Sequence, residues 1–380
     1  MELWACGFNA WNQLQFEGDL PDEPEDVFTF KRVLTSKGSI KIIGTSFSAS
    51  LVTCSSPDRS DRKGEFKKKL KKVEDHLELT RFSSIVAVSD DPSEPPKNLK
   101  VAGSPDGFLQ TQLEQITATN SAKLPKQTDS RLPEDKPSNA TAAGNDKIAV
   151  FTSTTLTQYP SLPTYLSQCN PDFVYPLPHI MQLVSNTTTF TALTREGNVY
   201  TWGDERYPAC LGREITLSSP AHTPTLLTPL LSLPTGSIQQ LSSSGPLTGA
   251  LTTGNDLYIW GRTNTPSIIP ELSSSPSSSP SPSSSPFPDN YDPIPLDIHG
   301  ADILDFGIGE NHMLVLTTEG ELYVIGENGN GQVGLGEEEK GRCEEWRLVD
   351  LEFAEGSGKR CVGVWAGYKC SFVVVEDISS

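Results

Sequence analysis

Apolar and polar positions alternate along the chain in an order that recurs. Three ten-residue stretches align without gaps, and each reads as Thr, a turn bearing Gly or Asn, and an alternating apolar strand that ends in Gly: TREGNVYTWG (194–203), TTGNDLYIWG (252–261) and TTEGELYVIG (317–326). Glycine adopts positive φ at little cost, and a period of two lines one face of a strand with apolar side chains. Each stretch therefore predicts a β-hairpin.

A second strand signal lies upstream of each hairpin, within a fifteen-residue frame. The frame starting at 180, 238, 303 and 362 repeats at separations of 58, 65 and 59 residues, and a fifth copy covers 40–54. Internal repeats at such a constant period predict one structural unit per repeat. Five units are clear, and the sequence as a whole predicts six or seven.

The two ends of the chain are predicted to share one unit. The copy at 362–376 has no hairpin strand after it, whereas ELWACG (2–7) matches the strand type of LYIWG and has no strand before it. Counted around the ends, Gly326 and Gly7 are 61 residues apart, which is one further repeat. Pairing of the first and last strands would close a ring and remove a free sheet edge.

A ring of units of this length ending in Y-x-W-G resembles the regulator of chromosome condensation repeat family. The stretch FGIGENHMLVLTTEGELYVIGENGNGQVGLG (306–336) carries the family's G-x-x-H, the hairpin and a Gly-rich turn. The resemblance implies an all-β fold, a single β-propeller domain over 1–380, with seven blades expected from the family. The recurrent positions predicted to pack the blades are Gly7, Gly203, Gly261, Gly309, His312, Gly326, Trp4, Trp202, Trp260 and Trp365.

The repeat pattern fades between 54 and 180, where 81–90 and 147–159 are the best strand candidates. Three segments are predicted to be insertions in the ring. They are a lysine-rich helical segment (56–80), a flexible excursion rich in Pro, Ser, Asn and Lys (92–146) and a Ser/Pro-rich disordered loop (273–288).

Two of these insertions carry regulatory or targeting signals. Lysines beside an apolar stripe at helical spacing predict a nuclear localisation signal, an acidic-partner site, a nucleic-acid contact, or a solvated helix docked on the ring; they are Lys67, Lys68, Lys69, Lys71 and Lys72. Four Ser-Pro steps predict either proline-directed phosphorylation or a plain spacer; they are Ser275, Ser279, Ser281 and Ser285.

Composition narrows the function classes. A formal net charge of −18 argues against a general nucleic-acid binder, whose affinity rests on phosphate neutralisation. Seven scattered cysteines without a CxxC pair suit a reducing compartment, and neither a secretory signal nor an apolar run of membrane-spanning length is visible. We expect a monomeric protein of the cytoplasm, the nucleus or both, not bound to a membrane.

The sequence carries no enzyme signature. It lacks H-E-x-x-H, a Cys/His cluster and G-x-S-x-G, and its Gly-rich turn lacks the G-K-[ST] ending of a phosphate-binding loop. We therefore predict no catalytic residue, no metal and no cofactor, and a protein that is not an enzyme.

Two acidic runs are the remaining surface signal. Each follows the last strand of a predicted hairpin, so ring closure would place both on one face of adjacent blades, as a negative patch for a basic partner or as ordinary solvated loops. The residues are Glu17, Asp19, Asp22, Glu23, Glu25, Asp26, Glu337, Glu338 and Glu339.

Two functions are consistent with these observations. The first is a non-catalytic scaffold for protein–protein interaction that binds a basic protein through the acidic loops. The resemblance implies chromatin-linked partners or, from compact members such as the fungal α-tubulin suppressors, tRNA-modification factors. The alternative, implied by the family's founding member, is guanine-nucleotide exchange on a Ran-type small GTPase, which needs neither a nucleophile nor a cofactor.

Overall fold

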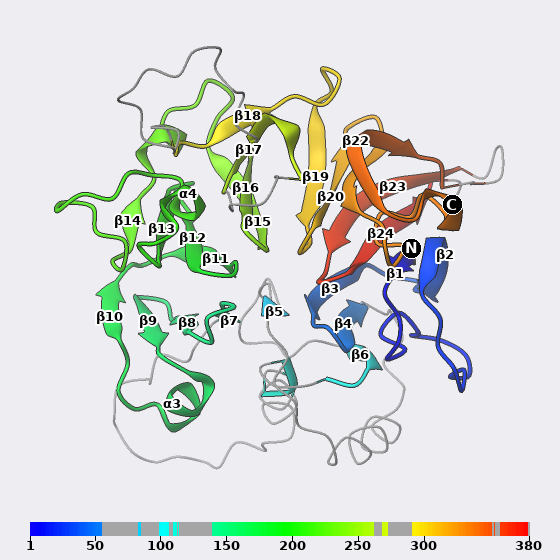
Figure 1. Cartoon of the computed structure of the whole chain (residues 1–380), viewed down its shortest axis with the longest axis horizontal. Helices are drawn as coiled ribbons and strands as arrows, with labels where there is room; N and C mark the ends of the chain where they lie inside the picture. Colours follow the sequence, from blue (N-terminus) through cyan, green and yellow to red (C-terminus); the bar gives the residue numbers. More distant parts are fainter. Residues whose placement is uncertain are drawn as a thin grey trace.

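A computed structural model describes residues 1–54, 83–84, 99–105, 109–111, 113, 139–261, 268–272, 291–351, 353 and 358–378. Six antiparallel sheets occupy most of these residues. Figure 1 shows the sheets set around a common axis, with β3, β7, β11, β15 and β19 near the middle and β2, β10, β14, β18 and β22 at the periphery. This is the arrangement of blades in a β-propeller, and the predicted all-β fold is confirmed.

Three blades consist of four strands in chain order, each built from the predicted fifteen-residue frame, its hairpin strand and one outer strand. They are β11 (Ile180–Ser185), β12 (Thr189–Thr194), β13 (Val199–Gly203) and β14 (Thr225–Leu226); β15 (Ile238–Ser244), β16 (Leu247–Thr252), β17 (Leu257–Trp260) and β18 (Ile294–Leu296); and β19 (Ile303–Ile308), β20 (His312–Thr317), β21 (Leu322–Glu327) and β22 (Arg342–Val349).

The fourth blade joins the two ends of the chain, as predicted. Its order is β23 (Lys359–Ala366), β24 (Cys370–Asp377), β1 (Glu2–Gly7) and β2 (Val27–Thr35). β1 pairs with β24 in unbroken register from Glu2 opposite Val375 to Gly7 opposite Cys370. The Glu2 carboxylate also accepts hydrogen bonds from Lys359 Nζ of β23 at 2.9 Å and Arg32 Nη1 of β2 at 3.2 Å, so it links the two outermost strands of this sheet to β1. We call this sheet the closing blade.

The remaining two sheets contain the region where the repeat pattern fades. One has three strands, β3 (Ile40–Thr45), β4 (Ala49–Cys54) and β6 (Leu99–Gly103). The other has five, in the order β10 (Phe173–Pro176), β9 (Thr155–Tyr159), β8 (Ile148–Phe151), β7 (Asn139–Ala142) and β5 (Ser83–Ser84). The prediction of strands over 147–159 is confirmed by β8 and β9, and β5 falls within the candidate stretch 81–90.

The predicted bounds of the flexible excursion are wrong at both ends. β6 and β7 lie within 92–146. They form strands because their backbones hydrogen-bond to the free edges of β4 and β8. Most of 92–146, together with 56–80 and 273–288, lies outside the described residues. The lysines of the first insertion and the four Ser-Pro serines are outside them too, so their roles stay predictions.

Apolar side chains between neighbouring blades form the core. One cluster joins the β19–β22 blade to the closing blade through residues such as Leu314 and Val373, and another joins the closing blade to the β3–β4–β6 blade through Leu3 and Ile42. Trp202 and Trp260 are fully buried, whereas Trp4 and Trp365 are partly buried against these clusters. Full burial of a large apolar side chain stabilises the fold by about 1.5–3 kcal/mol.

Short helices occupy some of the connections: α3 (Leu162–Ser167), α4 (Pro208–Leu211) and three 3₁₀ turns, Thr228–Leu230, Pro270–Leu272 and Glu337–Glu339. Within the described part of the chain, no helix is long and apolar enough to span a membrane.

Polar side chains on the inner strands connect the blades around the axis. Each inner strand of the clear repeats has a β-bulge near its start. Gln182 of β11 exchanges two hydrogen bonds with the backbone of Leu241 on β15, at 2.8 and 2.6 Å. Asp305 of β19 accepts from Gln240 Nε2 of β15 at 2.6 Å and from the Val364 N–H of β23 at 2.8 Å. Asp305 therefore connects three consecutive blades.

Candidate protein-interaction face

The loops that follow β1, β13 and β21, each the third strand of its blade, leave the ring on one face, which we call the loop face. Two of them hold the acidic runs. The N-terminal acidic loop (8–26) joins β1 to β2, and the C-terminal acidic loop (328–341) joins β21 to β22. Since β1 and β21 occupy equivalent positions in neighbouring blades, both loops emerge in the same direction.

A glycine starts each of these loops because no other residue fits there. Gly7 has φ of +115° and Gly326 has φ of +113°. A Cβ atom would lie 2.4 Å from the Lys369 carbonyl oxygen at Gly7 and 2.3 Å from the Asn311 carbonyl oxygen at Gly326. The close approach lets the next residue donate its N–H to that same carbonyl, at 2.8 Å in both loops. The predicted structural role of these two glycines is thus supported by their surroundings.

A buried asparagine folds each loop back on itself. Asn9 Oδ1 accepts from the Leu14 N–H at 3.0 Å, and Asn328 Oδ1 accepts from the Val333 N–H at 3.2 Å. The Asn9 amide donates to the Glu25 carbonyl at 3.2 Å, and that of Asn328 donates to the Glu339 carbonyl at 3.0 Å. Both acidic segments are therefore held by a rigid inner turn.

The same turn motif is present twice, although only the second copy was identified from the sequence. GFNAWNQL (7–14) aligns with GENGNGQV (326–333), and the aligned glutamines Gln13 and Gln332 each accept a backbone N–H two residues upstream. The shared Gly-x-Asn-x₃-Gln spacing was a visible signal. The first copy is harder to recognise because it lacks the inner glycines of the second. Asn12 stands where the second copy has Gly331, at a position of positive φ, which asparagine tolerates better than most residues.

The two acidic loops are in direct contact, which the sequence did not reveal. Asn330 Nδ2 donates to Asp26 Oδ2 at 2.8 Å, and the Gly336 N–H donates to the Phe28 carbonyl at 2.9 Å. Asp26 Oδ1 also accepts from the Asn9 N–H at 3.0 Å. Asp26 therefore joins the loops to each other, and its two occupied oxygens make it a structural residue instead of a free partner-binding group.

The other predicted carboxylates lie on the surface of this face. Glu17 pairs with Lys100 at 3.4 Å, and Glu339 pairs with Arg347 at 3.6 Å. Such exposed pairs contribute about 0–1 kcal/mol. Within the described residues no ion pair neutralises the remaining carboxylates, namely Asp19, Asp22, Glu23, Glu25, Glu337 and Glu338. The two loops together present a negative surface.

Aromatic side chains border the negative surface on the side of the ring axis. Phe8 and Phe47 have ring centroids 4.8 Å apart, and Phe47 lies 5.4 Å from Tyr368. Trp11, at the tip of the inner turn, is 51% exposed, and Leu20 is 56% exposed. Exposed aromatic residues beside charges are typical of protein–protein interfaces.

His312, the intact histidine of the G-x-x-H motif, packs between blades. Its Nε2 is 3.0 Å from Ser371 Oγ of the closing blade, and that hydroxyl donates to the Gln332 carbonyl at 2.5 Å. Because the serine hydroxyl donates its proton to that carbonyl, it can only accept a hydrogen bond from the imidazole. Nε2 therefore carries the imidazole proton, and Nδ1 is unprotonated and has no hydrogen-bond partner among the described residues. Burial lowers the pKa of His312 to about 4, which keeps it neutral.

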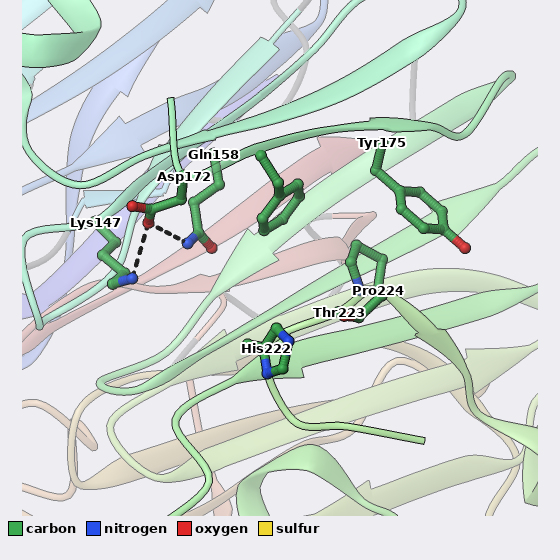
Figure 2. Close-up of a pocket in the computed structure, with 8 residues that line it drawn as sticks. Lys147, Gln158, Asp172, Tyr175, His222, Thr223 and Pro224 are labelled. Carbon is green, nitrogen blue, oxygen red and sulfur yellow. Dashed lines mark hydrogen bonds and ion pairs between the residues drawn. The ribbon is translucent and has the colours of Figure 1, made fainter. Parts of the chain in front are cut away.

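A pocket of about 200 Å³ lies elsewhere, between the outer edges of the β7–β10 and β11–β14 blades. Figure 2 shows Lys147 and Gln158 both pointing at Asp172, with Nζ and Nε2 at 2.8 and 2.6 Å from Oδ2, and the Tyr175 hydroxyl directed away from them. Trp202 Nε1 donates to Gln158 Oε1 at 2.9 Å. Lys147, Gln158 and Asp172 thus satisfy one another, and the volume of the pocket is below the usual 300–1,000 Å³ of ligand sites, so the acidic face is the stronger candidate.

No group of three or more potential metal ligands occurs in the part of the chain that the structure describes. Four of the seven predicted reduced cysteines, Cys6, Cys54, Cys361 and Cys370, are buried thiols whose pKa burial raises, which makes them poor nucleophiles.

Sequence comparison matches parts of the chain to known proteins. The family model described as Regulator of chromosome condensation (RCC1) repeat matches residues 303–332. The Ultraviolet-B receptor UVR8 of Arabidopsis thaliana is 36% identical over 90 residues, which are 23% of this chain and 19% of UVR8. The chain thus matches about a fifth of the length of this relative.

Solved structures resemble the chain over its whole length. Prp20p from Saccharomyces cerevisiae, reported with its binding properties to Gsp1p and histones, is 13% identical with a TM-score of 0.56, covering 100% of this chain and 92% of Prp20p. Human WBSCR16 is 12% identical with a TM-score of 0.54, covering 99% of this chain and 100% of WBSCR16. At these identities the likeness concerns the fold.

The sheets around one axis, with first and last strands in a shared blade, define a β-propeller. The family model match and the 36% identical stretch show that the chain contains repeats similar to those of the regulator of chromosome condensation family, which confirms the resemblance found in the sequence, and the solved structures confirm the propeller fold.

Proposed function

We propose that the protein is a non-catalytic interaction scaffold that binds a basic protein partner through the loop face. The observation that carries this proposal is the direct contact between the two acidic loops, which merges two separate runs of carboxylates into one surface. A continuous negative surface raises the association rate of a cationic partner and disfavours anionic ones. The likeness to Prp20p, whose report concerns binding to histones, supports a basic partner.

Charge reversal on the loop face tests this proposal. The variant Asp22→Lys/Glu23→Lys/Glu338→Lys removes three exposed carboxylates without touching Asp26. The matched control, Glu196→Lys/Asp302→Lys/Glu319→Lys, makes the same charge change at exposed sites on the opposite face. After affinity purification from native cells, we expect the first variant to lose its principal partners at least tenfold and the control to retain them.

Zero-length carbodiimide cross-linking then locates the contact. Partner lysines should couple to carboxylates of the two acidic loops in the native protein and not in the loop-face variant. Equal partner recovery by both variants, or cross-links confined to the opposite face, would refute the proposal.

The alternative is guanine-nucleotide exchange on a Ran-type GTPase, and the likeness to Prp20p, reported with its binding to Gsp1p, favours it as the second candidate. The measurement is release of fluorescent GDP from a purified Ran-type GTPase with and without the protein. Acceleration of at least tenfold that disappears in the loop-face variant supports exchange activity. An unchanged rate of GDP release would exclude exchange activity on this GTPase and leave the scaffold as the proposed function. For either function, we propose that the protein is located in the cytoplasm or the nucleus.

A further inference from the structure

A buried arginine lies beneath the loop that joins β13 to β14. Arg213 is 5% exposed, and its guanidinium donates to Thr201 Oγ1 and the Thr201 carbonyl, both at 3.1 Å. It also donates to the carbonyls of Ser219 at 2.9 Å and Pro220 at 3.1 Å, and to Ser219 Oγ at 2.6 Å. Within the described residues, no carboxylate pairs with this cation. A buried charge whose partners are all neutral retains a large affinity for an anion.

The shortest of these contacts reaches a hydroxyl on the surface loop. Ser219 closes a tight turn in which the Thr216 N–H donates to the Ser219 carbonyl and the Ser219 N–H donates to the Thr216 carbonyl, both at 3.1 Å. Leu217 within this turn is fully exposed, at 106%. The residue after Ser219 is Pro220, which gives the Ser-Pro sequence that proline-directed kinases require.

We propose that Ser219 is a phosphorylation site and that Arg213 is the built-in receptor for its phosphate. A proline-directed Ser/Thr kinase using ATP would form the bond between Ser219 Oγ and the γ-phosphorus and break the bond to the β-phosphate oxygen. ADP leaves, and the hydroxyl proton passes to a base of the kinase. The product carries about −1.5 to −2 charges at neutral pH.

The phosphate would convert a neutral contact into an ion pair at the same position. Nη1 already lies at hydrogen-bond distance from Oγ, so phosphate oxygens attached to Oγ come within reach of the guanidinium. Charge-assisted bonds of this kind order loops. The loop follows the third strand of its blade, so it belongs to the loop face, and phosphorylation would add negative charge to that face. This inference stands independently of the partner proposed above.

Phosphorylation of Ser219 can be tested directly. The full chain is treated with a purified proline-directed kinase and ATP, and the modified sites are mapped by mass spectrometry. We expect stoichiometric phosphate at Ser219, absent in Ser219→Ala and present in the matched control Ser218→Ala. Phosphate at other Ser-Pro sites of the same sample, such as Ser275 or Ser279, shows that the kinase is active. If those sites are modified and Ser219 is not, the proposal is overturned.

A ³¹P NMR titration of the phosphorylated protein tests the role of Arg213. An ion pair lowers the second pKa of the phosphate below the ordinary value of about 6. We expect that lowered value in the native protein, and a return toward 6 in Arg213→Lys, which keeps the charge but loses the planar fork. A pKa that is ordinary in the native protein, or indifferent to the substitution, would show that Arg213 only braces the loop.

Discussion

At the scale of single residues, two neighbouring blade junctions differ at the position of the histidine. Where the β19–β22 blade meets the closing blade, His312 reaches Ser371. At the next junction the histidine position is Cys370, and Ser50, the counterpart of Ser371, is fully buried with no hydrogen-bond partner among the described residues. An unsatisfied buried hydroxyl costs about 1–3 kcal/mol. Gly367 remains beside Cys370 as Gly309 does beside His312, so the backbone still has the form that admits a histidine.

The substitution Cys370→His should therefore stabilise the protein by about 1 kcal/mol, because imidazole Nε2–H can donate to Ser50 Oγ. Denaturant unfolding at pH 7.5 measures the gain. The new imidazole would lie near Thr45, which is larger than Ala366, its counterpart at the first junction. If the single variant is strained by this threonine, the double variant Cys370→His/Thr45→Ala provides the space that His312 has. A loss of stability in both variants would contradict the interpretation.

The pH dependence of that gain provides a second check. In the first junction burial lowers the pKa of His312 from 6.5 to about 4. A histidine whose folded pKa is lowered binds fewer protons when folded, so its stabilisation is complete above pH 6.5 and is lost as the pH falls toward 4. The new histidine should follow the same direction, so its benefit should disappear between pH 6.5 and 4.

At the scale of elements, Asp305 shows how strands of different blades are held in register. Its carboxylate accepts from Gln240 of β15, from Val364 of β23 and from the Phe306 N–H at 2.8 Å on its own strand. Burial raises the pKa of Asp305 above 3.8. An acid whose folded pKa is raised gives stability that is greatest at low pH and declines as the pH rises through the folded pKa.

Two substitutions at Asp305 separate charge from hydrogen bonding. Asp305→Asn keeps the two bonds that Oδ1 accepts and removes the buried charge, but its NH2 group faces the Val364 N–H, so it should cost about 1–2 kcal/mol at pH 7.5 and more at pH 4. Asp305→Leu leaves several buried partners unsatisfied and should cost about 2–4 kcal/mol at pH 7.5 and, because it also lacks the titrating carboxyl, more at pH 4. Unfolding curves of the two variants at pH 7.5 and 4 measure these differences. Equal losses from both would show that only packing matters at this site.

At the scale of the whole molecule, ring closure depends on one short strand near the N-terminus. β1 lies between β24 and β2 and contributes Leu3, Ala5 and Cys6, all fully buried, to the clusters on both sides of the closing blade. Without it, β24 and β2 would each expose a free edge.

Deletion of residues 2–16 should therefore destabilise the protein by more than about 4 kcal/mol, since a single buried Leu→Ala change already costs about 2–5 kcal/mol. Deletion of 273–286, a segment of similar length whose Ser/Pro composition cannot form a core, is the control and should change the melting temperature little. Thermal unfolding of the two variants decides the matter. An unaltered melting temperature after removal of 2–16 would contradict closure through β1.

Much of the fold could be predicted from the sequence because its signals are local. Alternating apolar residues and turn glycines predict the hairpins at 194–203, 252–261 and 317–326. The strand at 2–7 is predicted by its similarity to the last strands of these hairpins. β6 and β7 could not be predicted in this way. They are short, contain few large apolar residues, and owe their strand conformation to pairing with β4 and β8.

The sequence by itself thus determined the repeat, the three inner strands of each clear repeat, the shared blade at the ends and the position of both acidic runs. Only the tertiary structure decided which side chains meet. Asn330 and Asp26 are 304 positions apart, and Arg213 reaches Ser219 only because the loop folds back over β13. The physical reason is that alternation and turn chemistry act over a few residues, whereas contacts between loops and blades follow from how the packed sheets place distant segments.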